Sequence, residues 1–241
     1  MHRFARREYG TTSTARPAAP AIAQAQLRSN QARLRQLDGS HRQTGPATPP
    51  PTTTTSAPAT PAAAPTSIDV WGLHVTRSMC GCKDNVRDGI AWANTAAATY
   101  ATCNTPANTT GSAVDACFDA AQPDAVVDAQ TDAGGTMTLP PPSTDPCRII
   151  ENKGSLVHET MHSRHTDELA RGQSGAFFQA WKALAGDRDR LTKMRAKFPA
   201  ETAAFEARWH EGADWARDEV HSYTWERRFL VDALAALNRI C

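Results

Sequence analysis

The segment that most constrains the fold is residues 155–171, a run that contains neither glycine nor proline. Within this run lies the sequence His158-Glu159-Thr160-Met161-His162. Residues four apart share one face of a helix, so the two imidazoles can approach a single metal ion while Glu159 lies beside it. We therefore predict a helix that carries two metal ligands, and we expect residues 152–155 to supply the preceding turn and the N-cap.

A third ligand is expected on a second helix that begins near residue 213. Glu219 adjoins the apolar stripe of this helix and shares a face with Tyr223 and Glu226. A carboxylate at the margin of a buried stripe is costly unless a cation meets it, and zinc would do so. Glu219 is thus the preferred third ligand, with Asp218 and His221 as alternatives and a surface salt bridge as the ordinary explanation for all three. The predicted core positions are Ala216, Val220, Tyr223, Leu230, Leu234 and Leu237.

All six cysteines fall in the second part of the chain, at positions 80, 82, 103, 117, 147 and 241. An even number in a compact region favours a disulfide framework, drawn from 15 pairings, and implies an oxidising compartment. A bond between Cys80 and Cys82 is disfavoured because one intervening residue rarely allows good geometry. Reduced thiols or a second metal site are the alternatives. A thiol such as Cys80 or Cys147 could also keep the metal site latent by occupying its open position.

Residues 1–67 differ in composition from the rest. No aromatic residue lies between Tyr9 and Trp71, and residues 44–66 are mostly Pro, Thr and Ala, which favours extended, solvated backbone. Residues 1–43 hold eight Arg against two acids, so this tail is about six units positive and the remainder about five negative. We predict a disordered tail and linker over 1–67, with at most a short helix at 21–37, and a folded domain over 68–241. The tail is expected to be solvated, or to act as an adaptor or touch a polyanion.

The first residues do not lead into the apolar segment of a secretory signal, and no stretch is apolar enough to cross a membrane. Together with the cysteines, this predicts a protein that is secreted, or delivered to an oxidising compartment outside its cell or in a target-cell periplasm, by a route without such a signal. A start that has lost its signal would explain the same pattern. Neither a membrane nor a nucleic acid is expected as a partner.

The remaining patterns favour a mainly α fold, or α+β if a short edge strand forms. Helices are expected at 84–103 and 112–121, linked through Cys103 and Cys117. Residues 134–140 are expected to form either a turn and a short strand ahead of the metal-binding helix or a plain loop. Two further helices, one over 174–197 and one that includes Phe205 and Trp209, with Pro199 marking the break, are expected to pack between the two metal-binding helices.

The sequence His158-Glu159-Thr160-Met161-His162 resembles the active-site helix of zincin metallopeptidases. The resemblance implies that His158 and His162 bind Zn2+ and that Glu159 is the general base. The longer metzincin motif is not met, because His165 stands at the glycine position and Glu168 at the last histidine position. His165 is expected to lie beyond the metal, near the ligands or substrate or simply at the surface.

The pair Glu219 and Tyr223 resembles the third-ligand helix of gluzincin-like, toxin-type bacterial metallopeptidases, over a looser Glu-x-x-x-Tyr pattern. It implies that Glu219 completes the zinc site and that Tyr223, or His221, donates a hydrogen bond to the oxyanion. A tyrosine that simply fills the core is the alternative for Tyr223.

The resemblance implies a zinc metallopeptidase that hydrolyses a protein or peptide substrate, as a secreted or injected effector toxin. A delivered toxin would need an immunity or inhibitor protein as a partner. Two alternatives remain open at this level. The first is a zinc amidase or peptidase that acts on bacterial cell-wall peptides. The second is a non-enzymatic, disulfide-linked binding module in which any zinc is structural.

Overall fold

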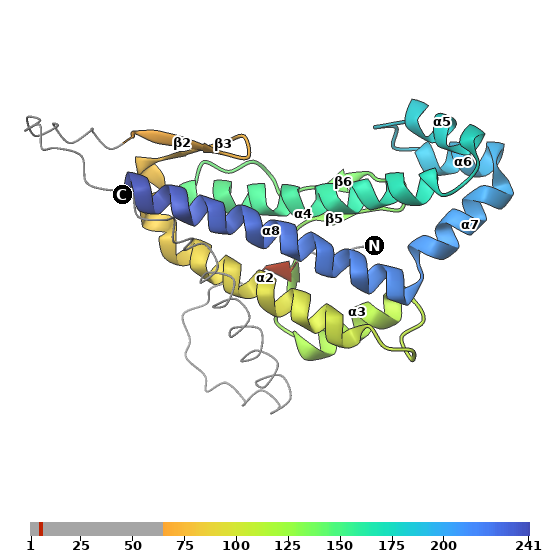
Figure 1. Cartoon of the computed structure of the whole chain (residues 1–241), viewed down its shortest axis with the longest axis horizontal. Coiled ribbons are helices and arrows are strands. Elements are labelled where there is room, and N and C mark those ends of the chain that lie inside the picture. The colour runs from red at the N-terminus through yellow and green to blue at the C-terminus, as the bar shows by residue number, and fades with distance from the viewer. Residues whose placement is uncertain (1–4, 7–64) are drawn as a thin grey trace, which may run out of the picture. The chain divides into compact units, whose positions relative to one another are not determined.

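The computed structural model describes residues 5–6 and 65–241, and these form a mainly helical domain linked by three disulfides (Figure 1). The folded domain was predicted to start near Ile68, and strand β2 begins at Ser67. The predicted tail and linker, including the helix at 21–37, lie almost entirely outside the described residues. No described helix is long and apolar enough to span a membrane.

Short strands accompany the helices and pair only in antiparallel twos within the described residues: β1 with β4, β2 with β3, and β5 with β6. The mainly α prediction is therefore confirmed. In chain order the elements are β1 (Ala5–Arg6), β2 (Ser67–Val70), β3 (Leu73–Thr76), the 3-10 helix η1 (Arg77–Cys82), α2 (Lys83–Cys103), α3 (Gly111–Ala121), β4 (Val126–Val127), β5 (Gln130–Thr131), β6 (Met137–Thr138), α4 (Pro146–Arg171), α5 (Gly175–Ala183), α6 (Arg190–Lys197), α7 (Pro199–Trp209) and α8 (Gly212–Ile240).

The long helix α8 is the centre of the domain. Helices α2 and α4 both pack along it, and Figure 1 shows α8 lying between them. Apolar residues recur on α8 at helical spacing, which gives it one continuous buried stripe. Of the predicted core positions, Ala216, Tyr223, Leu230 and Leu237 are buried, whereas Val220 and Leu234 are half-buried. Burial of one Leu or Phe side chain stabilises a fold by about 1.5–3 kcal/mol, so this stripe fixes α8 against its neighbours.

Helix α4 begins earlier than the sequence predicted, so the N-cap assigned to residues 152–155 is wrong. The helix starts at Pro146, and the Asp145 side chain accepts a hydrogen bond from the Cys147 amide. Gly154 and Ser155 lie inside it: a Cβ at Gly154 would only contact Glu226 and Leu230, and Ser155 donates to the Glu151 carbonyl. Gly154 therefore faces α8 inside the helix rather than forming a turn, and the contacts there would also admit a Cβ.

The region 174–209 forms three helices, not the two predicted. The break between α5 and α6 contains Gly186 with a φ of 80°, a backbone conformation that ends a helix. The three helices also do not lie between the metal-binding helices. They gather at the end of the domain where α4 leads into α8, around their own core of Phe177, Trp181, Met194 and Phe205 (Figure 1).

The helices predicted at 84–103 and 112–121 are confirmed as α2 and α3, each within one residue of its observed start. The stretch 134–140 forms a strand for two residues only, β6, which pairs with β5 and contacts α4. The short edge strand therefore exists, and the rest of this stretch is connecting chain.

The disulfides join Cys80 to Cys241, Cys82 to Cys147, and Cys103 to Cys117. Their Cα separations of 5.8, 5.1 and 5.8 Å fall in the range usual for disulfides. Cys80 and Cys82 are not paired with each other, as predicted. Because neither Cys80 nor Cys147 is a free thiol, the latency hypothesis is wrong. A framework of this kind indicates an oxidising environment.

Two of these disulfides hold the ends of the two longest helices together. Through the first, η1 is joined to the C-terminal end of α8, and through the second to the N-terminal end of α4. Replacing Cys80 and Cys241 together by serine is expected to lower the free energy of unfolding by about 2–4 kcal/mol. The matched pair Cys103 and Cys117, which closes 14 residues rather than 161, should cost less when replaced in the same way. Urea titration measures both, and an equal or larger loss for the shorter loop would contradict the expectation.

Candidate metal centre

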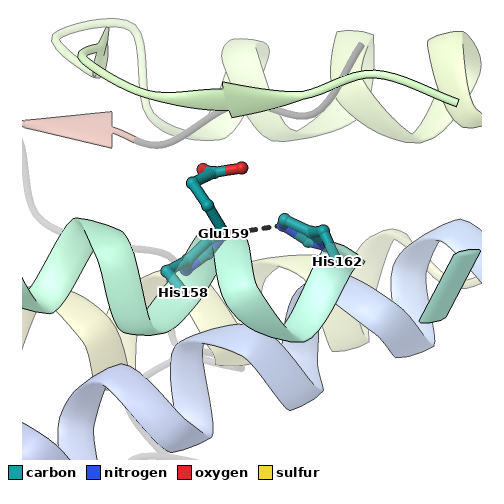
Figure 2. Close-up of side chains that lie close together, drawn as sticks. All are labelled: His158, Glu159 and His162. Carbon is teal, nitrogen blue, oxygen red and sulfur yellow. Dashed lines mark hydrogen bonds between the residues drawn. The ribbon is translucent and has the colours of Figure 1, made fainter. Parts of the chain in front are cut away.

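His158, Glu159 and His162 form a buried group on α4 that could hold a metal ion. Their relative exposure is 0%, and one potential ligand atom from each lies within 4.8 Å of the others. The His158 Nε2 and His162 Nε2 atoms are 2.9 Å apart. Figure 2 shows the two rings turned toward each other across one helical turn, with the Glu159 carboxylate on the side away from α8. The predicted placement of both imidazoles at one point is therefore confirmed.

Glu219 reaches the same point from α8. Its Oε2 atom lies 3.5 Å from His158 Nε2 and 3.7 Å from His162 Nε2, and its side chain is fully buried. Three atoms with lone pairs thus converge, two from α4 and one from α8. Glu219 was predicted to lie on a second helix, and the packing of α8 along α4 brings it to the histidines.

The opposite edges of the two imidazoles also face α8. His162 Nδ1 lies 2.7 Å from Asp218 Oδ2 and 3.2 Å from Ser222 Oγ. His158 Nδ1 lies 3.3 Å from Glu226 Oε2. The contact between His158 and Glu226 does not meet hydrogen-bond geometry, so it is an electrostatic contact rather than a formed hydrogen bond. Asp218 is therefore placed behind His162, not at the point where the ligand atoms converge.

Burial makes this cluster unfavourable without a cation. Desolvation raises the pKa of Glu219 to about 8, although nearby His158 acts to lower it. Desolvation likewise raises the pKa of Glu226 to about 8 and that of Asp218 to about 6. It lowers the pKa of His162 well below the ordinary value, so the imidazole is neutral. The same desolvation disfavours the ionised form of all three carboxyl groups, and a buried metal ion would offset it, so the residues fit a metal.

Glu159 is held on its other side by strand β5. Its Oε2 accepts a hydrogen bond of 2.6 Å from the Thr131 hydroxyl, and Thr131 is itself fully buried. Its Oε1 is buried and has no hydrogen-bond partner within the described part of the chain. Desolvation raises the pKa of Glu159, and the nearby His158 and the bond from Thr131 act to lower it. The carboxylate thus has one oxygen fixed and one able to accept a proton.

Tyr223 lies in the core behind the histidines. Its ring meets His158 edge-on, with centroids 4.4 Å apart, and lies 6.0 Å from the ring of Tyr100. The Tyr100 hydroxyl and the Trp215 indole both donate to Asp115. Burial raises the pKa of Tyr100 far above its ordinary range, so this network stays uncharged at the phenol. Because Tyr223 lies between Tyr100 and His158, its ring restricts the orientation of the His158 ring.

The alternative ligand His221 and the nearby His165 lie away from the point where the ligand atoms converge. His221 is exposed and its Nε2 accepts a hydrogen bond from the Trp225 indole, whereas His165 stacks near Trp209 at 6.0 Å. Both histidines line a cavity of about 280 Å³ between α4 and α8, which also includes Asp218. The cavity therefore borders the Asp218 side of His162 rather than the point where the ligand atoms meet.

Three residues around the site were not assigned a role from the sequence: Thr131, Ser222 and Glu226. Ser222 and Glu226 follow Asp218 at intervals of four residues, the same interval that separates His158 from His162. This shared spacing was the signal in the sequence for Ser222 and Glu226. Thr131 carried no such signal, because it lies on a two-residue strand far from the motif in sequence.

The raised pKa of Glu226 predicts a pH dependence in metal-free protein. A carboxyl group whose pKa rises from 4.5 to about 8 on folding contributes stability that is fully present below pH 4.5 and is lost as pH rises through 8. Glutamine imitates the protonated group. After metal removal, Glu226→Gln should melt at the wild-type temperature near pH 4 and several degrees higher at pH 9. Calorimetry of both proteins at the two pH values measures the difference in melting temperature. The same difference at both pH values would contradict the prediction.

Comparison with protein-family models, with curated proteins and with solved structures returned no match. The function must therefore be argued from the site itself.

Proposed function

We propose that the protein is a zinc-dependent metallopeptidase whose metal is held by His158, His162 and Glu219. The observation that carries the proposal is the convergence of three buried lone-pair atoms at mutual distances of 2.9, 3.5 and 3.7 Å, with the Glu159 carboxylate beside them. Two imidazoles and one carboxylate form a ligand set typical of catalytic zinc.

The distances support zinc in particular. Zinc binds nitrogen and oxygen at about 2.0–2.2 Å, and a tetrahedron of that size has edges of about 3.3–3.6 Å. The three measured separations fall around this value, with the pair of Nε2 atoms slightly closer. Calcium and magnesium prefer all-oxygen sites with more ligands, so two imidazoles argue against them.

The contacts of each side chain suggest its role in the reaction. Zinc, when bound, lowers the pKa of a water ligand and polarises a carbonyl oxygen. Glu159 receives the proton of the attacking water at Oε1, the oxygen that is not engaged by Thr131. Tyr223 packs edge-on against His158 from the core side, and this contact supports a role in holding the ring rather than the predicted role as donor to the oxyanion.

The metal centre is completely buried, and this restricts how a substrate can reach it. Thr131 donates to the very carboxylate that would serve as base, and it also lies 3.3 Å from the Glu159 backbone carbonyl. Thr131 therefore covers Glu159 on the side of β5, and a substrate that reaches Glu159 from that side must approach past this strand. We therefore propose that an extended peptide is the substrate and that it enters along the β5–β6 segment, beside α4. The disulfide framework agrees with an effector that works outside its cell, in which case an immunity or inhibitor protein would be a partner.

The same burial favours one second candidate, a structural metal site. Structural zinc sites are closed by four protein ligands, and Glu159 lies near enough to the histidines to be the fourth. In that case the protein would be a non-enzymatic binding module, and Glu159 would be needed for metal affinity rather than for hydrolysis.

Incubation of the zinc-loaded full chain with two substrates tests the proposal. Denatured protein and purified bacterial cell wall are offered in parallel, and new amino termini are counted with and without a chelator. Chelator-sensitive cleavage of the denatured protein supports a peptidase, whereas release of amino groups from the cell wall alone would move the activity to wall cross-links. No cleavage of either substrate by protein that retains zinc would favour the structural site.

A further inference from the structure

We propose that Asp218 and Glu226 are positioning residues that fix the tautomer and orientation of both metal-binding histidines. The inference rests on the proposed zinc site and adds to it two carboxylates that touch neither metal nor substrate. They act through His162 and His158, and both come from the helix that also supplies Glu219.

The contact between Asp218 and His162 is the shorter of the two and is a hydrogen bond. Asp218 Oδ2 lies 2.7 Å from His162 Nδ1, and both side chains are almost fully buried. An ionised carboxylate only accepts hydrogen bonds, so Nδ1 must be the protonated nitrogen and Nε2 must carry the lone pair. Ser222 Oγ lies 3.2 Å from the same Nδ1 and closes its remaining side. The ring is therefore held with its lone pair directed at His158 and Glu219.

Glu226 favours the same tautomer of His158, through an electrostatic contact rather than a formed hydrogen bond. Its Oε2 lies 3.3 Å from His158 Nδ1, with exposures of 0% for the histidine side chain and 5% for the glutamate side chain. Protonation of Nδ1 again leaves Nε2 with the lone pair. Two Nε2 lone pairs and the Glu219 carboxylate would then face one another at 2.9 to 3.7 Å, an arrangement that repels unless a cation lies between them.

The spacing on α8 explains how one helix can serve both rings. Positions 218, 222 and 226 lie four residues apart and form one row, while Glu219 lies one residue away on the adjoining row. The row contacts the Nδ1 edges and Glu219 reaches the Nε2 edges. A shift of α8 along α4 would therefore break the metal ligand and both orienting contacts together.

Carboxylates behind metal-binding histidines commonly contribute 10–100-fold to metal affinity. The shorter contact of Asp218 predicts the larger effect. We expect Asp218→Asn to weaken zinc binding by about 100-fold and Glu226→Gln by about 10-fold, because each amide keeps the shape and removes the charge.

The test is zinc affinity of the full chain, measured by competition with a chromophoric chelator. The matched control is Asp214→Asn, one turn earlier on α8, where the buried carboxylate pairs with Arg208 and Arg217 and touches neither histidine. It should bind zinc within threefold of wild type. Circular dichroism of each metal-free variant establishes that it is folded at the titration temperature.

A second readout concerns the rings themselves. Nitrogen-15 spectra of the zinc-loaded wild type should show both histidines protonated at Nδ1 and metal-bound at Nε2. Wild-type affinity in Asp218→Asn and Glu226→Gln, or coordination through Nδ1, would overturn the inference while leaving the zinc site intact. A wild type that binds no zinc would overturn both this inference and the proposed function. If Asp218→Asn does not fold, Glu226→Gln and the nitrogen spectra decide.

Discussion

Replacement of Glu159 by glutamine is expected to keep one zinc per chain and to lower kcat for peptide hydrolysis by about 10²- to 10⁴-fold. The amide preserves the size of the side chain and its bond with Thr131 but cannot accept the proton from water. Because the proton acceptor acts in the transition state, KM should change little. Rates on the substrate identified by cleavage of denatured protein, together with elemental analysis of the same samples, measure both quantities.

The matched control is Glu168→Gln, an exposed carboxylate on the same helix that lies outside the metal-binding group. It should retain the wild-type rate. Loss of zinc in Glu159→Gln would instead make Glu159 a ligand, and with it the site would be the closed, structural kind. Full activity in Glu159→Gln would remove it from the mechanism altogether.

Removal of the metal is expected to lower the melting temperature of the domain by about 10 °C. Free zinc at a thousand times its dissociation constant stabilises the folded state by about 4 kcal/mol, and a domain of this size shifts by about 2–4 °C per kcal/mol. The ligands join α4 to α8 at the centre of the fold, so the loss should affect global unfolding. Calorimetry with and without a chelator, followed by readdition of zinc, measures the shift.

The variant Glu219→Gln provides the control for this experiment. It removes the ligand charge contributed by α8 and imitates the protonated carboxyl, so the metal-free helix pair should remain folded. Its melting temperature should then respond to a chelator by no more than 2–3 °C. A variant that responds as strongly as wild type would show that Glu219 does not hold the metal.

Much of the helical framework could be predicted because it depends on local patterns. The apolar period of α2 and α8 and the four-residue spacing of His158 and His162 are visible in the sequence and were recovered in the fold. The placement of Glu219 opposite the histidines also followed, since a carboxylate beside an apolar stripe faces the interior wherever that stripe is buried.

What could not be predicted depends on contacts between distant segments. The pair Gly154 and Ser155 resembles a turn and an N-cap when the sequence is considered alone, and only the packing of α4 along α8 shows that the helix continues through both residues. Thr131 meets Glu159 across 28 residues of sequence, on a strand too short to leave a pattern. The pairing of the cysteines likewise depends on which helix ends come together, which the spacing of cysteines does not encode.

The most direct test of the account is the zinc content of the purified full chain, compared with His162→Ala and Glu219→Ala. The account predicts one zinc per chain in the wild type and none in either variant, with each variant confirmed as folded by circular dichroism. Zinc retained without Glu219 would contradict the ligand set drawn from α4 and α8. A folded wild type that binds no zinc when it is supplied would contradict the proposed function itself.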